Sequence, residues 1–120
     1  MLKPRVIVCL DVKDGFVVKG TKFRNLRRIK RPWDAASLYE EQNADEIVFL
    51  DISASREKRK TFLDYVEKTA RRLFIPLTVG GGIGSFTDAR NVLRAGADKV
   101  SVNTAAVAKP SIIGDIAASF

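Results

Sequence analysis

The sequence predicts an α/β fold of four βα units with parallel strands, the arrangement of half of a TIM (βα)8 barrel. Three observations lead to this fold class. Short apolar runs alternate with amphipathic segments, one segment is repeated, and a glycine-rich turn follows a strand. The 120 residues allow one domain, whereas a whole barrel of this kind needs roughly 250 residues.

Four apolar runs predict the strands. Each is short, rich in β-branched residues and without strict alternation of apolar and polar positions. That pattern is typical of parallel strands that are covered on both faces. The expected strands span residues 6–10, 47–50, 77–79 and 100–102.

The segments between these strands have helical stripes of apolar residues. Pro32 suits the first turn of a helix that follows the first strand. The second helix covers residues 62–73, and the third ends at Gly96, which suits a C-terminal cap. The fourth covers residues 112–117. The expected order is therefore β-α-β-α-β-α-β-α with right-handed crossovers.

An internal repeat supports a barrel fragment. The segment Ala-Asp-Glu-Ile-Val at residues 44–48 is matched by Ala-Asp-Lys-Val-Ser at residues 97–101. We therefore expect one half-barrel domain, residues 1–120, built from two βαβα repeats at about 1–74 and 75–120. A stand-alone flavodoxin-like sheet is the alternative, and it would need a fifth strand or an exposed edge.

The composition argues for a soluble cytoplasmic protein. Hydrophobic residues make up 46% of the chain, and no apolar run approaches the ~18 residues of a membrane span. The first apolar run is too short for a secretory signal. The single cysteine, Cys9, lies inside that run, so we expect a buried, reduced thiol.

The net charge of +7 raises the question of an anionic partner. Six lysines and arginines crowd into residues 22–31, with Phe23 as the one aromatic residue. No nucleic-acid motif surrounds this stretch, so we expect no nucleic-acid partner. The remaining explanations are a loop that steers a phosphorylated small molecule and ordinary surface charge.

The stretch from Leu77 to Asp88 indicates a phosphate site. A buried strand is followed by three glycines, and Ser85 with Asp88 three residues later resembles a capping box at the start of a helix. Glycines let the backbone approach a ligand and present N–H groups to an anion. The alternative is a tight turn that holds no ligand.

Polar residues gather where the expected strands end, which is where barrels of this type bind ligands. They are Asp11, Asp51, Gly80–Gly82, Asn103 and Thr104. The chain has no histidine, and Asp11 is the best-placed candidate for a general acid or base. The alternative role for Asp11 is to cap the following turn.

Charged residues mark two further positions. Lys19 lies in a segment, residues 14–20, that predicts a short hairpin or mobile flap able to close over an anion. Arg5, Glu46 and Lys99 each precede an apolar run, so inward-facing side chains would form a paired ring at the amino-terminal mouth of the barrel. Such a ring would be a plug or a gate for a small molecule.

Five segments of the chain resemble the cyclase subunit of imidazole glycerol phosphate synthase, of histidine biosynthesis. The resemblance covers essentially all 120 residues, and a sister sugar isomerase shares the half-barrel repeat and the glycine turn but not the Cys-Leu-Asp-Val strand or the flap. The segments are residues 5–12, 15–20, 49–54, 79–83 and 96–105.

The resemblance implies a (βα)8 barrel that takes ammonia from a glutaminase partner. It implies conversion of phosphoribulosyl-formimino-aminoimidazole carboxamide ribotide to imidazole glycerol phosphate and aminoimidazole carboxamide ribotide. Asp11 matches a catalytic aspartate and Lys19 the flap lysine. The positions that match substrate and phosphate ligands are Asp51, Gly81, Gly82, Asn103 and Thr104.

The resemblance also implies an ammonia gate and a docking face. Arg5, Glu46 and Lys99 match three members of the gate, and Asp98 lies on the face that docks the glutaminase. It implies no cofactor, no metal and no membrane. The second catalytic aspartate, the second phosphate site and the fourth gate charge of the family have no counterpart in these residues.

From this departure we expect a half-barrel that is weakly active or inactive alone. Its open strand edges and apolar surface should drive self-association into a homo-oligomer. The alternative hypothesis is a non-catalytic, phosphate-binding scaffold that assembles with itself.

Overall fold

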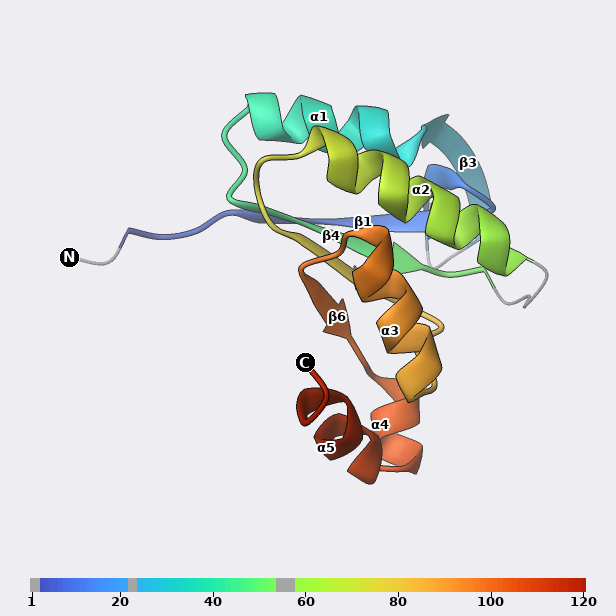
Figure 1. Ribbon diagram of the computed structural model, residues 1–120. Coiled ribbons are helices and arrows are strands. Elements are labelled where there is room, and N and C mark those ends of the chain that lie inside the picture. The colour runs from blue at the N-terminus through green and yellow to red at the C-terminus, as the bar shows by residue number, and fades with distance from the viewer. Residues whose placement is uncertain (1–2, 22–23, 54–57) are drawn as a thin grey trace.

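The computed structural model describes residues 3–21, 24–53 and 58–120, and it contains one six-stranded sheet with the order β3-β2-β1-β4-β5-β6 (Figure 1). Within these ranges, six strands and five helices follow one another. The strands are β1 (Ile7–Lys13), β2 (Phe16–Thr21), β3 (Arg24–Lys30), β4 (Glu46–Asp51), β5 (Leu77–Gly80) and β6 (Lys99–Ser101). The helices are α1 (Pro32–Glu41), α2 (Arg59–Arg72), α3 (Phe86–Ala95), α4 (Thr104–Ala108) and α5 (Ser111–Ala117).

The four predicted strands are confirmed as the parallel part of this sheet. β1 pairs with β4, β4 with β5, and β5 with β6, all in parallel. The register aligns side chains in rows across the four strands. One row contains Asp11, Leu50, Gly80 and Ser101. Strand β1 is longer than predicted, so Asp11 lies within the strand rather than at its end.

Two strands extend the sheet beyond the four predicted ones, and both are antiparallel, within residues 16–30. β2 pairs antiparallel with β1 at Val12 and Lys13, and β3 pairs antiparallel with β2. Residues 24–30 of the basic stretch therefore form an edge strand instead of a loop. Val17 and Val18 of β2 are buried, and pairing with β3 satisfies the backbone groups beside them.

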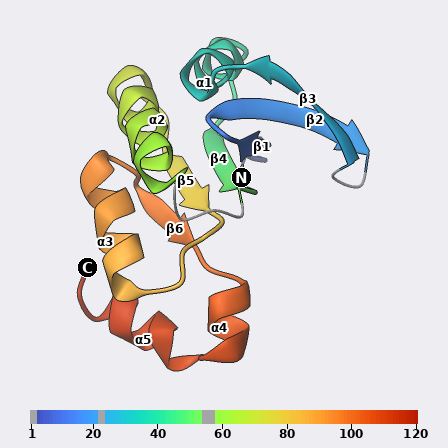
Figure 2. The ribbon, with the colours of Figure 1, turned by 90° about the vertical axis from the view of Figure 1, so that its right-hand side faces the viewer.

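Helices α1, α2 and α3 lie side by side along one face of the parallel strands (Figure 2). Pro32 occupies the first turn of α1 and Gly96 caps α3 with a φ of 121°, both as predicted. The helix predicted over residues 112–117 is confirmed as α5, and a short additional helix, α4, precedes it. Lys109 and Pro110 separate them, and a proline cannot continue the backbone hydrogen bonds of the preceding helix.

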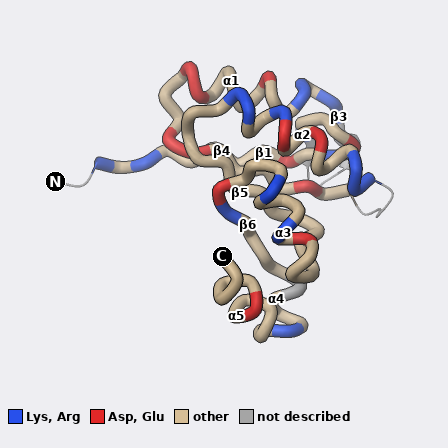
Figure 3. The backbone as a smooth tube through the Cα atoms, viewed as in Figure 1, with Lys and Arg blue, Asp and Glu red and all other residues tan. Residues whose placement is uncertain are grey.

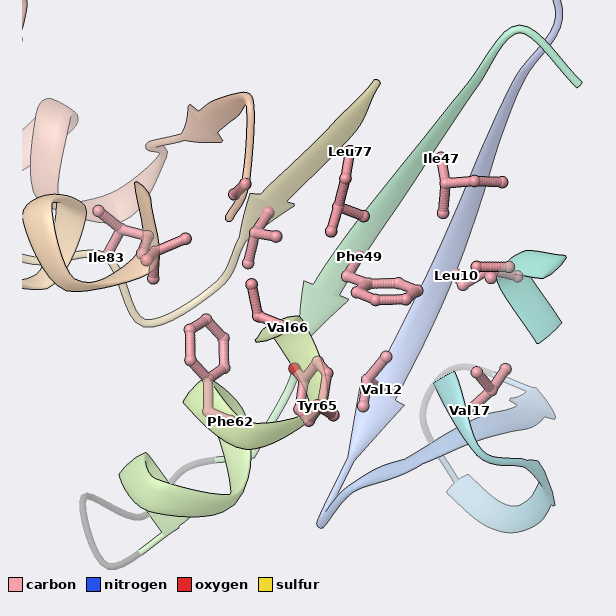
Figure 4. Packing of buried hydrophobic residues seen from close by; sticks show 14 of the residues in the cluster. Leu10, Val12, Val17, Ile47, Phe49, Phe62, Tyr65, Val66, Leu77 and Ile83 are labelled. Carbon is pink, nitrogen blue, oxygen red and sulfur yellow. The ribbon is translucent and has the colours of Figure 1, made fainter. Parts of the chain in front are cut away.

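The hydrophobic core lies between these helices and the sheet (Figure 4). Val12, Phe49 and Val79 have no exposed surface, and they alternate along their strands with residues on the opposite face. Phe49 contacts Tyr65 edge-on, with ring centres 5.7 Å apart. The opposite face carries no helix in the described part of the chain. Cys9 lies there and is exposed, so the prediction of a buried thiol is wrong.

The sheet is not closed. β3 and β6 are its two edges among the described residues, and β1 pairs with β2 only through its last two residues. The mostly parallel, open sheet with helices along one face fits half of a (βα)8 barrel.

Candidate functional site

Asp11 occupies the face of the sheet opposite the helices. Its neighbours Leu10 and Val12 point into the core, so the alternation of the strand places Asp11 on the other side, where it is half-buried. Gly80 lies in the same row two strands away, a separation of roughly 10 Å at the usual strand spacing. That span separates the candidate acid or base from the glycine turn.

Asp11 and Lys19 both line a cavity of about 340 Å³ in the gap between β1 and the hairpin of β2 and β3, beside α1. Lys19 comes from β2, the first strand of the antiparallel hairpin, and it is exposed. The cavity is also lined by Cys9 and by Tyr39 of α1. A carboxylate and an ammonium group that share one cavity can bind a polar anionic ligand and exchange a proton with it.

The glycine turn after β5 has two left-handed residues. Gly81 has a φ of 85° and Gly82 a φ of 70°. A Cβ atom on Gly81 would lie 2.1 Å from the backbone oxygen of Asp51, so only glycine fits. Gly82 has no heavy atom within 3.7 Å of such a position. The turn is thus packed against β4 at Gly81 and open at Gly82.

Helix α3 begins with the predicted serine cap. The backbone N–H of Asp88 donates to the Ser85 hydroxyl at 3.1 Å. The Asp88 carboxylate accepts from the backbone N–H of Gly84 at 3.0 Å, one residue before the position that a capping box would use. Arg59 lies 3.8 Å from this carboxylate and donates to the carbonyl of Gly82 at 3.2 Å. Arg59 therefore fixes the outer side of the glycine turn.

Asp51 lies on the helix side of the sheet. The Tyr65 hydroxyl donates to its Oδ2, and its Oδ1 accepts from the backbone N–H of Ser53 at 2.8 Å. Burial raises the pKa of Tyr65, and the Asp51 carboxylate raises it further. The Ser53 hydroxyl in turn accepts from the backbone N–H of Asp14 at 2.9 Å. The described contacts of Asp51 thus hold the end of β4 against α2 and the following turn. Its contact with substrate stays a prediction.

The remaining phosphate candidates follow β6. Asn103 is exposed, and its backbone carbonyl accepts from the N–H of Val107, at the start of α4. β6 pairs with β5 up to Ser101 and Gly80, so Asn103 follows the strand beside the glycine turn. The side chain of Thr104 lies outside the part of the chain that the structure describes.

At the amino end of the sheet, Glu46 and Lys99 form an ion pair. The Glu46 side chain is 8% exposed and the Lys99 side chain 59%. Arg5 is exposed and forms no ion pair with either residue among the described side chains. The structure therefore brings together two of the three predicted gate residues.

The aspartates before β4 and β6 bind the backbone of a neighbouring strand. Asp45 Oδ2 accepts from the N–H of Val6 at 2.6 Å, and Asp98 Oδ2 accepts from the N–H of Leu77 at 2.8 Å. The carbonyl groups of Val6 and Leu77 accept from the aspartate N–H groups at 2.8 Å in both cases. Asp98 is exposed and already has this internal role.

Three residues at the site were not predicted from the sequence: Ser53, Arg59 and Tyr65. Tyr65 follows the helical spacing of Phe62 and Val66, so an apolar stripe explained it, although a buried tyrosine needs a hydrogen-bond partner. Arg59 lies in a run of basic residues without a distinguishing pattern. Positive charge also gathers along β3, as Figure 3 shows.

No described helix has both the length and the apolar character needed to cross a membrane. Among the described residues, no group of three or more cysteine, aspartate and glutamate side chains has the arrangement of a metal site.

The open parallel sheet, with polar residues at one end of its strands, defines a fragment of the βα-barrel class. A family model described as histidine biosynthesis protein matches residues 5–120, so the chain belongs to this family, whose members are TIM barrels. The match includes every described residue of the candidate site.

Proteins named imidazole glycerol phosphate synthase subunit HisF are similar to the whole chain. The protein of Methanocaldococcus jannaschii is 59% identical over 120 residues, 100% of this chain and 44% of that protein. The protein of Bacillus cereus strain ATCC 10987 is also 59% identical over 120 residues and is covered to 48%. That of Halalkalibacterium halodurans is 62% identical over 113 residues, 94% of this chain and 45% of that protein. The chain spans about half the length of the curated relatives it matches.

Proposed function

We propose that this chain forms one half of the active centre of an imidazole glycerol phosphate synthase cyclase. The observation that carries the proposal is the cavity shared by Asp11 and Lys19, in a chain 59% identical to synthase subunits over its full length. The reaction would convert phosphoribulosyl-formimino-aminoimidazole carboxamide ribotide and ammonia to imidazole glycerol phosphate and aminoimidazole carboxamide ribotide.

In this proposal Asp11 transfers protons and Lys19 holds the substrate. A half-buried carboxylate on the face of the sheet opposite the helices can give a proton to a leaving nitrogen or take one from an attacking amine. Lys19 neutralises substrate charge from the neighbouring strand. The second carboxylate of the reaction comes from another half of the barrel. Loss of one member of an acid/base pair removes a factor of roughly 10²–10⁴, so we expect this half to be weakly active or inactive alone.

The glycine turn would bind one phosphate of the substrate. Gly82 is the open position of the turn, where an anion can approach the backbone N–H groups. Gly81 gives the turn its shape, and Asn103 and Thr104 would supply side-chain donors from the adjacent strand end. The roughly 10 Å between this turn and Asp11 leaves room for a sugar between the phosphate and the reacting atoms.

The Glu46–Lys99 pair would form part of an ammonia gate at the opposite end of the strands, with Arg5 as a further member. Ammonia would come from a glutaminase that docks on the face containing Asp98. The bond between Asp98 and Leu77 means that a docking variant must be checked for folding before loss of binding is assigned to the interface.

The open sheet would be completed by a second half-barrel, supplied by another copy of the chain when no other half is present. Two observations support self-association. Residues 7–11 of β1 form no backbone pairs with β2, and Val6 and Ile7 are 58% and 50% exposed. Sedimentation of the purified chain tests this point. A dimer or larger oligomer is expected, and a stable monomer at micromolar concentration would contradict it.

Reconstitution tests the enzymatic proposal. The chain is mixed with the carboxyl-terminal half of the Methanocaldococcus jannaschii relative, and ammonia-dependent turnover is measured. We expect turnover from the mixture, and a loss on the order of 10²-fold or more for Asp11→Asn. Lys13→Gln is the matched control, because Lys13 is exposed on the same strand and does not line the cavity.

A folded mixture without turnover would refute the cyclase proposal. Full turnover with Asp11→Asn would favour the alternative, in which the chain is a non-catalytic phosphate-binding scaffold. Phosphate affinity that depends on Asn103 but no turnover in any mixture is the pattern expected for that scaffold.

A further inference from the structure

A second cavity lies beside α1 and α2 and shares no lining residue with the cavity of Asp11 and Lys19. Its volume is about 280 Å³, near the lower end of the range for small-molecule sites, roughly 300 Å³. Three separate segments converge on it: the turn between β1 and β2, the junction between β3 and α1, and one face of α2. The lining residues are Gly15, Arg31, Trp33, Thr61, Asp64, Tyr65 and Lys68.

Aromatic rings hold two cations at this cavity. The guanidinium carbon of Arg31 lies 3.8 Å from the ring centre of Phe16 and 5.7 Å from that of Trp33. The ammonium group of Lys68 lies 4.8 Å from the ring centre of Trp33. Such cation–π contacts restrain long side chains without using up their hydrogen-bond donors. Arg31 and Lys68 are therefore positioned in advance around one indole ring.

The two cations keep most of their capacity to bind an anion. Arg31 donates to the carbonyl of Gly15 at 3.3 Å, which uses one of the five N–H donors of a guanidinium group. Among the described residues, Asp64 is the one acid that lines the cavity. In the described part of the chain, none of Arg31, Asp64 and Lys68 takes part in an ion pair within 4.0 Å. The cavity lining thus has one more positive than negative charge.

We propose that this cavity binds a small anion through a phosphate or carboxylate group held by Arg31 and Lys68. An anion between the two cations would relieve their mutual repulsion and would accept charge-assisted hydrogen bonds from both. Thr61 supplies a hydroxyl for a further hydrogen bond at the wall formed by α2. Tyr65 lines this cavity and also donates to Asp51 at the end of β4. The proposal does not depend on the cyclase reaction, because its anion-binding groups, on Arg31, Thr61 and Lys68, belong to no part of the strand-end site.

The position of the cavity connects it with the hairpin. Gly15, in its wall, and Asp14 both have positive φ angles, 83° and 51°, and they form the turn from which β2 begins. The carbonyl of Gly15 is already bound to Arg31. A bound anion would therefore contact the side chain that fixes this turn.

Trp33 makes the proposal directly testable, because it is the single tryptophan of the chain. The full chain is titrated with sodium pyrophosphate and, separately, with sodium citrate, against sodium chloride of equal ionic strength. The readouts are Trp33 fluorescence and the indole N–H resonance. We expect a saturable change with the anion that fits, and the two probes distinguish a phosphate site from a carboxylate site.

Variants of α2 test the assignment. Lys68→Ala should raise the dissociation constant about tenfold, the loss of one charge-assisted hydrogen bond. Lys68→Arg keeps the charge and should bind within about threefold of the original chain. Lys60→Ala is the matched control, since it removes an exposed lysine of the same helix outside the cavity. Asn103→Ala should leave the Trp33 signal unchanged, which separates this site from the glycine turn.

Two results would overturn the proposal. One is the absence of a saturable Trp33 change with both probes. The other is equal weakening by Lys60→Ala and Lys68→Ala, which would mean diffuse attraction by surface charge. Circular dichroism of each variant establishes that the chain is folded, and the exposed positions of Lys60 and Lys68 make unfolding unexpected.

Discussion

In both copies of the repeated Ala-Asp segment, the aspartate before a strand binds the backbone of the neighbouring strand, through Val6 in one copy and Leu77 in the other. The carboxyl ends of two neighbouring strands, β4 and β5, differ in what holds them. After β4, side chains hold the chain in place, through Asp51, Ser53 and Tyr65. After β5, glycine conformations and a helix cap do so.

This difference shows where a site can form. The β4 end uses its polar side chains for internal bonds, whereas the β5 end leaves backbone N–H groups and the open position at Gly82 available to a ligand. The two ends also touch, because Gly81 packs on the backbone of Asp51. The side-chain network after β4 therefore supports the glycine turn after β5.

The largest expected effect is at that contact. Gly81→Ala would place a methyl group 2.1 Å from the Asp51 oxygen at a φ of 85°, and we expect a loss of about 3 kcal/mol or more in the free energy of unfolding. A methyl group on Gly82 would meet only an ordinary contact, 3.7 Å from the Arg59 guanidinium group, so Gly82→Ala should lose only about 1 kcal/mol from its left-handed backbone. Urea unfolding of both variants measures the difference. Equal losses would mean that the two ends do not pack as described.

Tyr65→Phe breaks the network on the β4 side. The substitution leaves the Asp51 carboxylate without its buried donor, so unfolding should become easier by about 1–3 kcal/mol. Tyr39→Phe is the control, since the Tyr39 hydroxyl has no hydrogen bond to the described residues and Tyr39 is half-buried. If Tyr65→Phe destabilises the chain no more than Tyr39→Phe does, the hydrogen bonds around Asp51 do not contribute to its stability.

The same tyrosine should produce a signature at alkaline pH. The pKa of Tyr65 is raised in the folded chain, whereas an unfolded tyrosine loses its proton at about pH 10. At pH values between these two pKa values, the unfolded state therefore binds fewer protons than the folded state. Stability from this group is therefore complete below pH 10 and falls as the pH rises. Stability curves of the original chain and Tyr65→Phe should converge above pH 10. Parallel curves would contradict the raised pKa.

The contrast between the two strand ends also shows what a sequence can predict. The four parallel strands, four helix positions, the cap at Ser85 and the C-cap at Gly96 depend on local patterns, and each is confirmed. The antiparallel strand β3 was missed because its charged sequence lacks a strand pattern and becomes a strand by pairing with β2. The division into two repeats stays a prediction.

The candidate site residues stay predictions, and they were chosen from the same kind of local signal. Asp11, Lys19 and the glycine turn stood out because a charge or a glycine interrupts an apolar pattern. Asp51 stood out in the same way, but its partner Tyr65 lies 14 residues away and could not be paired from the sequence. Glu46 and Lys99 were expected to pair, although Arg5 was expected beside them.

The aspartates of the two copies should differ when replaced. Asp98→Ala removes the acceptor of the Leu77 N–H, and Leu77 is 1% exposed, so water cannot easily replace the bond. We expect a loss of about 1.5–3 kcal/mol. The Val6 N–H is exposed, so Asp45→Ala should cost less, about 0.5–1 kcal/mol. Thermal unfolding of both variants shows which substitution destabilises more. A larger loss for Asp45→Ala than for Asp98→Ala would contradict this prediction.

The smallest expected effect concerns the ion pair that joins the two copies. Glu46 and Lys99 occupy equivalent positions in the repeat and bind each other. Because the Lys99 side chain is 59% exposed, solvent screens the pair, and a double-mutant cycle of Glu46→Gln and Lys99→Met should give a coupling of about 0.5–1 kcal/mol. Lys99→Met alone should destabilise more than Glu46→Gln alone, because it leaves a carboxylate buried without a partner. The coupling should shrink in 1 M salt, where the screening length is about 3 Å. A coupling that does not respond to salt would mean that Glu46 and Lys99 interact by packing and not by charge. The hydrogen bonds of Asp45 and Asp98 would then be the polar contacts that hold the two copies of the repeat in the sheet.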